Sequence, residues 1–142
     1  MQSVSPAARA RFVLPVRVYY EDTDAAGVVY YANYLRFLER ARTEWLRALG
    51  FDQSQLARTH GIAFAARSLS VEYLKAAQLD DALNVSAEVE SMGRAQLVFA
   101  QRVERGDELL LEAKLRVACI DARRLKPAPI PDEIRTKLKA LT

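Results

Sequence analysis

Apolar residues recur at three- and four-residue steps along one stretch of the chain, from Tyr31 to Gly50. This spacing is typical of a helix with one buried face, and charged residues fall on the opposite face. Gly50 is a natural helix end, because glycine takes the left-handed backbone conformation without a Cβ penalty. The residues expected on the buried face are Tyr34, Leu35, Leu38, Ala41, Trp45, Leu46 and Leu49.

Polar and apolar residues alternate with a period of two in five other segments, a pattern typical of strands with one buried face. The first segment precedes the long helix and the other four follow it. Their ranges are 12–21, 68–73, 83–90, 96–104 and 109–121. A hairpin turn is expected at Arg105, Gly106 and Asp107, between the last two segments. Two short helical segments are also expected, over residues 54–59 and from Asp132 onwards.

One long helix that follows the first strand of a five-stranded, mostly antiparallel sheet predicts the α+β class. Such a helix can bury its apolar stripe only against the sheet, so the sheet must curve around it. We expect one domain over residues 12–142, preceded by a disordered N-terminal segment over residues 1–11. The sheet would leave exposed edges, which pairing with a second copy of the chain could cover.

The composition is that of an ordinary globular domain, with 51% hydrophobic and 27% charged residues. The formal net charge is +3, but basic residues alternate with acidic ones without the aromatic-basic signature of RNA binding. We therefore expect no nucleic-acid partner, and the mild positive charge fits either a solvated surface or a phosphorylated ligand. No stretch approaches the roughly twenty apolar residues of a membrane span. The single cysteine, Cys119, excludes an intrachain disulfide and fits a reducing cytoplasm, where we expect the protein.

Residues 18–34 carry the candidate chemistry: a strand, an acidic turn, a glycine, an apolar step and the start of the long helix. A helix N-terminus presents unpaired N–H groups and a positive partial charge, which favour the oxyanion formed when a carbonyl is attacked. A carboxylate on the preceding turn can face the same carbonyl carbon, which is a minimal apparatus for acyl transfer. In the alternative interpretation, Asp22, Thr23 and Asp24 only bond their own turn and cap the helix.

Residues 20–30, YEDTDAAGVVY, resemble the signature of the 4-hydroxybenzoyl-CoA thioesterase family. Within that family, the likeness is greatest to the bacterial acyl-CoA thioesterases associated with the Tol-Pal envelope system. It extends over about residues 15–131 and includes residues 33–34, 39–44, 70–73, 79–81, 91–92 and 97–99. The resemblance implies a hot-dog fold, hydrolysis of acyl-coenzyme A, and a homodimer or dimer of dimers with active sites at the dimer interface.

The resemblance also implies roles for individual residues. It places the catalytic carboxylate on Asp24, the carbonyl-polarising backbone N–H on Tyr31, and a substrate-binding position at Gly27. Whether Asp24 attacks the carbonyl or activates a water is left open by the motif. Tol-Pal-associated members usually carry histidine where this chain has Tyr31, whereas 4-hydroxybenzoyl-CoA enzymes have an aromatic residue there.

Cations at the rim of the site would be needed for the phosphates of coenzyme A, and by resemblance the candidates are Arg94, Arg124 and Lys126. Each could instead be an ordinary surface charge. Glu39 is a further candidate carboxylate, although neighbouring arginines favour a helix salt bridge. No phosphate loop, dinucleotide-binding fingerprint or metal-ligand cluster occurs in the sequence, so we expect no metal and no bound cofactor.

Two rival functions stay open beside thioester hydrolysis. A hot-dog dehydratase would need a histidine at the site, but the only histidine, His60, falls in a short expected helix and is interpreted as a surface or packing residue. A non-catalytic acyl-thioester binder or envelope-assembly partner would use Asp24 structurally. The acyl carrier could be coenzyme A or acyl carrier protein, and the sequence does not decide between them.

Overall fold

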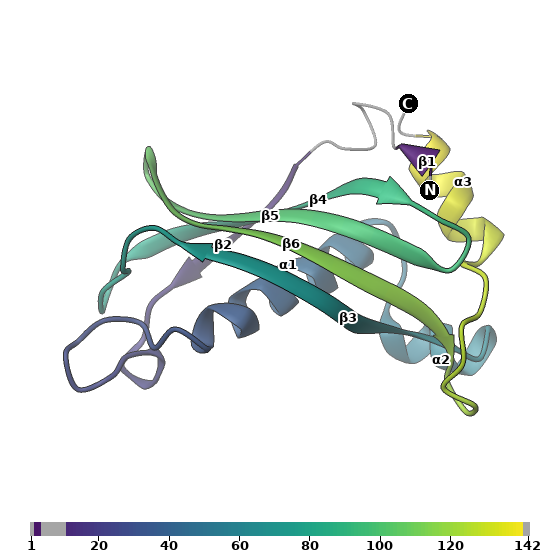
Figure 1. The fold of residues 1–142 in the computed structure, drawn as a ribbon, viewed down its shortest axis with the longest axis horizontal. Helices are drawn as coiled ribbons and strands as arrows, with labels where there is room; N and C mark the ends of the chain where they lie inside the picture. The colour runs from purple at the N-terminus through teal and green to yellow at the C-terminus, as the bar shows by residue number, and fades with distance from the viewer. Residues whose placement is uncertain (1, 4–10, 141–142) are drawn as a thin grey trace.

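The computed structural model describes residues 2–3 and 11–140 of the chain. In this part, a curved sheet wraps around one long helix (Figure 1). The disordered segment expected over residues 1–11 falls mostly on residues 1 and 4–10, which lie outside the described residues. Gln2–Ser3 form a short strand, β1, which pairs with Ser91 and Met92.

The sheet is antiparallel at every strand pair. Its strand order is β1-β4-β5-β6-β3, and β2 also pairs with β4. The five expected strands are therefore confirmed, and the fold is α+β. In the described chain β3 has only β6 as a neighbour, so its other edge is open. The strand bounds are Phe12–Arg17 (β2), Ile62–Tyr73 (β3), Ala82–Met92 (β4), Gln96–Arg105 (β5) and Glu108–Asp121 (β6).

Three α-helices accompany the sheet: α1 (Asn33–Ala48), α2 (Gln53–Thr59) and α3 (Asp132–Ala140). The helix α1 lies on the concave side of the sheet, whereas α2 and α3 lie together at one end of it (Figure 1). All three helices were expected from the sequence, and α1 begins slightly after the predicted start at Tyr31. No helix in the described part of the chain is long and apolar enough to cross a membrane.

The first strand ends earlier than the alternation predicts, at Arg17 instead of residue 21. A 3₁₀ turn follows over Tyr20–Asp22. Its cause is local, because the Asp22 carboxylate accepts a hydrogen bond from the Tyr19 N–H at 2.8 Å and bends the backbone. Tyr20 is consequently 82% exposed instead of extending the buried face of the strand.

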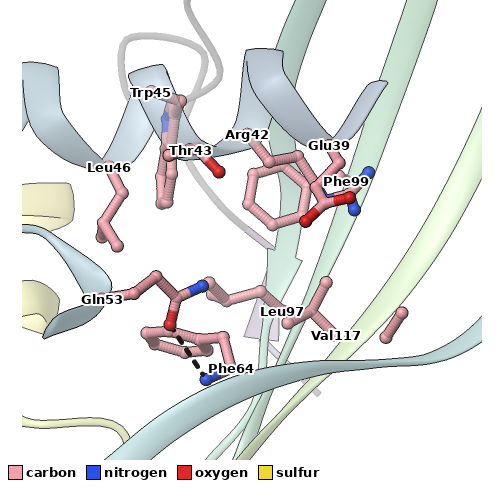
Figure 2. Close-up of a pocket in the computed structure, with 11 residues that line it drawn as sticks. Glu39, Arg42, Thr43, Trp45, Leu46, Gln53, Phe64, Leu97, Phe99 and Val117 are labelled. Carbon is pink, nitrogen blue, oxygen red and sulfur yellow. Dashed lines mark hydrogen bonds between the residues drawn. The ribbon is translucent and has the colours of Figure 1, made fainter. Parts of the chain in front are cut away.

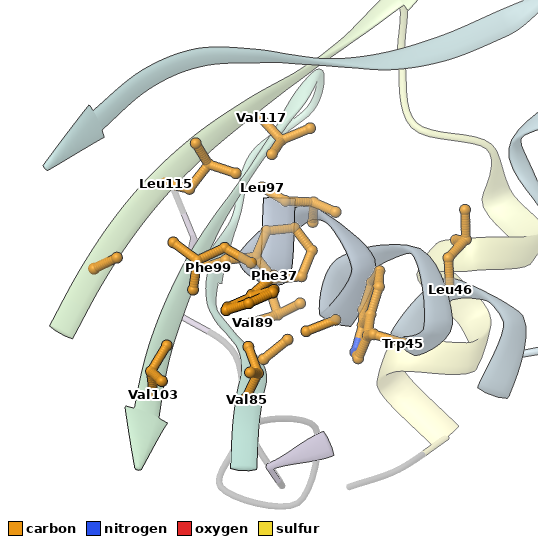
Figure 3. Close-up of a cluster of buried hydrophobic side chains, with 14 of the residues drawn as sticks. Phe37, Trp45, Leu46, Val85, Val89, Leu97, Phe99, Val103, Leu115 and Val117 are labelled. Atoms are coloured by element: carbon orange, nitrogen blue, oxygen red, sulfur yellow. The ribbon is translucent and has the colours of Figure 1, made fainter. Parts of the chain in front are cut away.

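The core lies between α1 and the inner face of the sheet (Figure 3). The predicted helix stripe is correct for most positions, but Leu35 is 37% exposed and Phe37, which the prediction omitted, is fully buried. Leu46 points to the same side of α1 as Leu35. Leu46 is buried and lines a cavity together with Gln53 of α2, whereas Leu35 lies toward the other end of α1, which α2 and α3 do not cover (Figure 1).

Candidate active site

The acidic turn is closed by short backbone contacts. Thr23 and Val29 form an isolated antiparallel bridge, and the Asp24 N–H donates to the Val28 carbonyl at 2.9 Å. The Gly27 N–H donates to the Asp24 carbonyl at 3.0 Å, and Gly27 has a φ of +79°, a conformation that favours glycine. No heavy atom lies within 4 Å of the place where a Cβ on Gly27 would stand. The turn is therefore compact and leaves open space beside Gly27.

Asp22 and Asp24 have different environments. Asp24 is exposed, and its Oδ1 accepts hydrogen bonds from the N–H groups of Ala26 at 2.8 Å and Val28 at 3.4 Å. No hydrogen bond from a described residue reaches its Oδ2. Asp22 is 7% exposed and both of its carboxylate oxygens are bonded. Contacts with the turn and the helix start thus account for both oxygens of Asp22, whereas Oδ2 of Asp24 accepts no hydrogen bond from the described residues.

The start of α1 offers free backbone donors. The N-cap residue is Ala32, and no side chain in the described part of the chain accepts a hydrogen bond from the first N–H groups of the helix as a cap would. The Tyr31 N–H also donates to no described residue. An open pocket of about 340 Å³ joins this helix start to the acidic turn. It is lined by Glu21, Asp22, Thr23, Asp24, Tyr30, Ala32, Asn33 and Arg36. A carboxylate and the positive end of a helix therefore face one open space, as acyl transfer requires.

Tyr31 itself does not line that pocket, and its side chain lies within a group of aromatic rings. Its ring lies 4.7 Å from the ring of Tyr30 and 6.3 Å from that of Tyr73, measured between centroids. The Tyr73 hydroxyl donates to the Tyr31 carbonyl at 3.0 Å. Desolvation raises the pKa of Tyr73, so this hydroxyl stays protonated and able to donate. The ring of Tyr31 is thus not needed to form the pocket. The backbone of Tyr31 is bonded to β3 through the Tyr73 hydroxyl.

His60 lies away from the pocket, at the C-terminal end of α2. Its Nε2 is 3.6 Å from the Glu133 carboxylate of α3. Because α2 and the start of α1 lie at opposite ends of the molecule (Figure 1), His60 cannot reach Asp24 within one chain.

The three predicted phosphate-binding cations are also distant from Asp24 in the same chain. The acidic turn bonds to the segment before β4, through Val29 to Ala77 and Leu79 to Gly27. Arg94 follows the far end of β4, so about 30 Å of strand separates the two. Arg124 and Lys126 lie at that far end too. Asp121 accepts from the Arg124 N–H and donates to the Lys126 carbonyl. The segment that follows returns to Arg94, whose carbonyl accepts from the Ile130 N–H. One chain alone does not bring these cations to the acidic turn.

Glu39 lines a second, smaller cavity between α1, α2 and the sheet (Figure 2). Its volume is about 100 Å³, and Arg42, Thr43 and Gln53 supply its other polar groups. The predicted helix salt bridge is wrong, because Glu39 makes no ion pair with any described residue within 4.0 Å. Burial lowers the pKa of Arg42 to about 10, and its guanidinium donates to the Gln101 Oε1 at 2.9 Å. Glu39 is therefore open to the cavity but lies outside the pocket of Asp24.

Sequence reasoning gave no role at the site to Asn33, nor to Glu21 and Arg36, which also line the pocket. Asn33 is 8% exposed and its amide donates to Asp22 at 2.9 Å. An asparagine at the first position of an amphipathic helix was a usable signal, since it is placed on the buried side one step before Tyr34. Among the described residues, no group of three or more His, Cys, Asp or Glu side chains could hold a metal ion.

Similar proteins share both the fold and most of the chain length. Residues 18–138 match the family model described as the thioesterase-like superfamily. The acyl-CoA thioesterase YbgC of Haemophilus influenzae is 48% identical over 124 residues, covering 87% of this chain and 91% of that protein. The acyl-CoA thioester hydrolase YbgC of Escherichia coli is 47% identical over 129 residues, covering 90% and 96%. A solved structure of a probable thioesterase from Bartonella henselae has a TM-score of 0.83 at 34% identity, covering 86% of this chain and 100% of that one.

Proposed function

Because the chain belongs to the thioesterase-like superfamily, we propose that it hydrolyses acyl-coenzyme A, with Asp24 as its catalytic carboxylate. The YbgC relatives, which are named acyl-CoA thioesterases, support the substrate class. The observation that carries the residue assignment is the Asp24 carboxylate, with one oxygen held by the turn and the other unbonded. The Asp24 carboxylate lines a pocket that is also lined by Ala32 and Asn33 at the start of α1.

Hydrolysis adds water across the thioester, giving a carboxylic acid and the thiol of coenzyme A. In one route Oδ2 of Asp24 attacks the carbonyl carbon, the thiolate leaves, and water cleaves the resulting anhydride. In the other, Asp24 takes a proton from water as that water attacks, and the proton passes to the leaving thiolate. In both routes the Tyr31 N–H and the helix N-terminus stabilise the oxyanion. Gly27 leaves room beside the turn for the substrate.

Two rival functions give different results in assays. A dehydratase would hydrate an enoyl thioester, but no histidine lies near Asp24 in the described chain. A non-catalytic binder would retain acyl-coenzyme A without releasing thiol. We therefore expect purified protein to release free thiol from acyl-coenzyme A and to leave enoyl thioesters unhydrated. Three further points stay predictions: a cytoplasmic location, an association with the Tol-Pal system, and the use of acyl carrier protein as the acyl carrier.

The aromatic side chain of Tyr31 should be dispensable. We expect Tyr31→Phe to keep kcat within about twofold of the wild type, because the proposed donor is the backbone N–H and Tyr31 does not line the pocket. Steady-state kinetics with one acyl-coenzyme A checks this. A loss of tenfold or more would assign the hydroxyl a part in the reaction.

The open edge of β3 predicts a homodimer. Antiparallel pairing of two β3 edges places the Ile62 end of one strand beside the Tyr73 end of its partner. Asp121 pairs with Ile62, and Tyr73 bonds to Tyr31, so such a dimer brings the partner's cationic end toward the acidic turn. Sedimentation at micromolar concentration should therefore give at least twice the chain mass of 16.0 kDa, as a homodimer or a dimer of dimers. A fully active monomer would contradict this arrangement.

Arg94, Arg124 and Lys126 are proposed to bind the phosphates of coenzyme A across that interface. Replacing all three by alanine should raise KM for acyl-coenzyme A and leave kcat unchanged, because phosphate contacts are the same in ground and transition states. A truncated thioester without the nucleotide should be unaffected, and the difference should shrink at high salt. Arg123→Ala, on the same exposed turn, is the matched control.

Mixed dimers test whether the cations come from the partner. A chain with Asp24→Asn and a chain with all three cations replaced are each defective alone. If each site combines Asp24 of one chain with cations of the other, the mixed dimer contains one intact site. Mixing should then restore turnover at low acyl-coenzyme A concentration. No restoration in a proven mixed dimer would show that these residues do not meet across the interface.

A further inference from the structure

A buried polar pair lies beneath the acidic turn. Asp22 is 7% exposed and Asn33 is 8% exposed. The Asn33 Nδ2 donates to Asp22 Oδ1 at 2.9 Å, and the Tyr19 N–H donates to Asp22 Oδ2 at 2.8 Å. Both oxygens of this carboxylate are therefore committed to protein donors inside the fold. Asp22 is poorly placed to attack a substrate, and its bonds serve to hold segments together.

The same two residues are joined through the backbone. The Tyr30 N–H donates to the Asp22 carbonyl at 3.1 Å, and the Asn33 N–H donates to the Tyr30 carbonyl at 2.8 Å. The 3₁₀ turn after β2, the returning loop and the first residue of α1 thus meet at one point. We call the Asp22–Asn33 pair the clamp.

The two clamp residues flank the two proposed reacting groups in the sequence. Asp24 is two residues after Asp22, and Tyr31 is two residues before Asn33. The carboxylate comes from the turn and the N–H from the helix start, so their separation depends on how these two segments are fixed. Misplacement of a reacting group by about 1 Å can reduce a rate about a hundredfold.

We infer that Asp22 and Asn33 are positioning residues, which hold the Asp24 carboxylate and the Tyr31 N–H at the separation that the thioester carbonyl requires. This inference rests on the proposed function of Asp24. A positioning role acts on the reacting groups and not on binding of the nucleotide. Its loss should therefore lower kcat and leave KM nearly unchanged.

The pair can be tested by exchanging its two members. In Asp22→Asn, the new amide oxygen can still accept from the Tyr19 N–H, but its NH₂ group faces the NH₂ group of Asn33, so the pair can bond only if the Asn33 amide rotates away from its native orientation. In Asn33→Asp, two buried carboxylates face each other and repel. In the double variant, the amide at position 22 donates to the carboxylate at position 33, and the hydrogen bond is restored with its direction reversed.

We expect each single variant to lose about tenfold or more in kcat, with KM within about twofold of the wild type. The double variant should recover to within about threefold of the wild-type kcat. Recovery is informative because a catalytic role of the Asp22 carboxylate could not be restored with an amide at position 22. If both single variants lose kcat and a folded double variant stays as slow as either, the clamp does not position the site.

Two further variants separate positioning from stability and from folding failure. Asp52→Ala removes the N-cap of α2, where Asp52 accepts from the Gln55 N–H at 2.7 Å. It should lower the melting temperature and keep kcat, which shows that lost stability alone does not slow the reaction. Asn33→Ala removes the donor without adding charge, and a folded Asn33→Ala variant with wild-type kcat would overturn the inference.

The clamp and the assignment of Asp24 can fail separately. If Asp24→Asn stays active, the proposed function of Asp24 is wrong whatever the clamp variants do. If Asp24→Asn is inactive but Asp22→Asn and Asn33→Asp both keep wild-type kcat, only the clamp is wrong. Circular dichroism and melting temperature, measured on every variant, confirm that the compared proteins are folded.

Discussion

Asp24→Asn is expected to lower kcat for acyl-coenzyme A by about a hundredfold to ten-thousandfold, the range for a positioned acid or base. The amide can neither attack the carbonyl nor take a proton from water. The fold should be retained, because the amide oxygen can still accept from the Ala26 N–H, as Oδ1 of Asp24 does at 2.8 Å. Initial rates of thiol release, with matched melting temperatures, measure the effect.

His60→Ala is the control for the loss at Asp24. It removes the only imidazole of the chain, which lies at the end of α2 opposite the acidic turn. We expect turnover to stay within about twofold of the wild type, since no contact links His60 to the pocket. Asp24→Asn with activity within threefold of the wild type would refute the assignment, and a folded but inactive His60→Ala would show that the site is incomplete.

Phe37→Ala is expected to lower the free energy of unfolding by about 3–5 kcal/mol, the usual cost of emptying a buried aromatic site. Phe37 is fully buried on α1, and its ring meets that of Tyr34 edge to face at 6.2 Å. Figure 3 shows it among side chains of the sheet, including Val89 and Phe99. Urea denaturation, with the slope compared between variants, measures the change.

Leu35→Ala is the matched control on the same helix. Leu35 is 37% exposed in the chain, so its truncation should cost far less than that of Phe37. If Leu35→Ala destabilised the protein as much as Phe37→Ala, the helix face assigned to the core would be wrong.

Much of the fold was determined by local sequence patterns. The three- and four-residue spacing located α1, and the period of two located the five strands and the hairpin at Gly106, because these repeats are set by the geometry of each element. The acidic turn before the helix was also located from the sequence, whereas its part in acyl transfer stays a prediction. These features depend on residues close together in the chain, and the structure bears out where they lie.

Only the tertiary structure decided which of two similar acids is available. Asp22 and Asp24 look alike in the sequence, but the return of the chain through Tyr30 and the packing of Asn33 bury Asp22 and leave Asp24 exposed. Likewise, Leu35 is left exposed because α2 and α3 cover only one end of α1. The separation of Arg94 from Asp24 followed from the length of β4. Each outcome depends on which distant segments meet, and a periodic pattern contains no information about that.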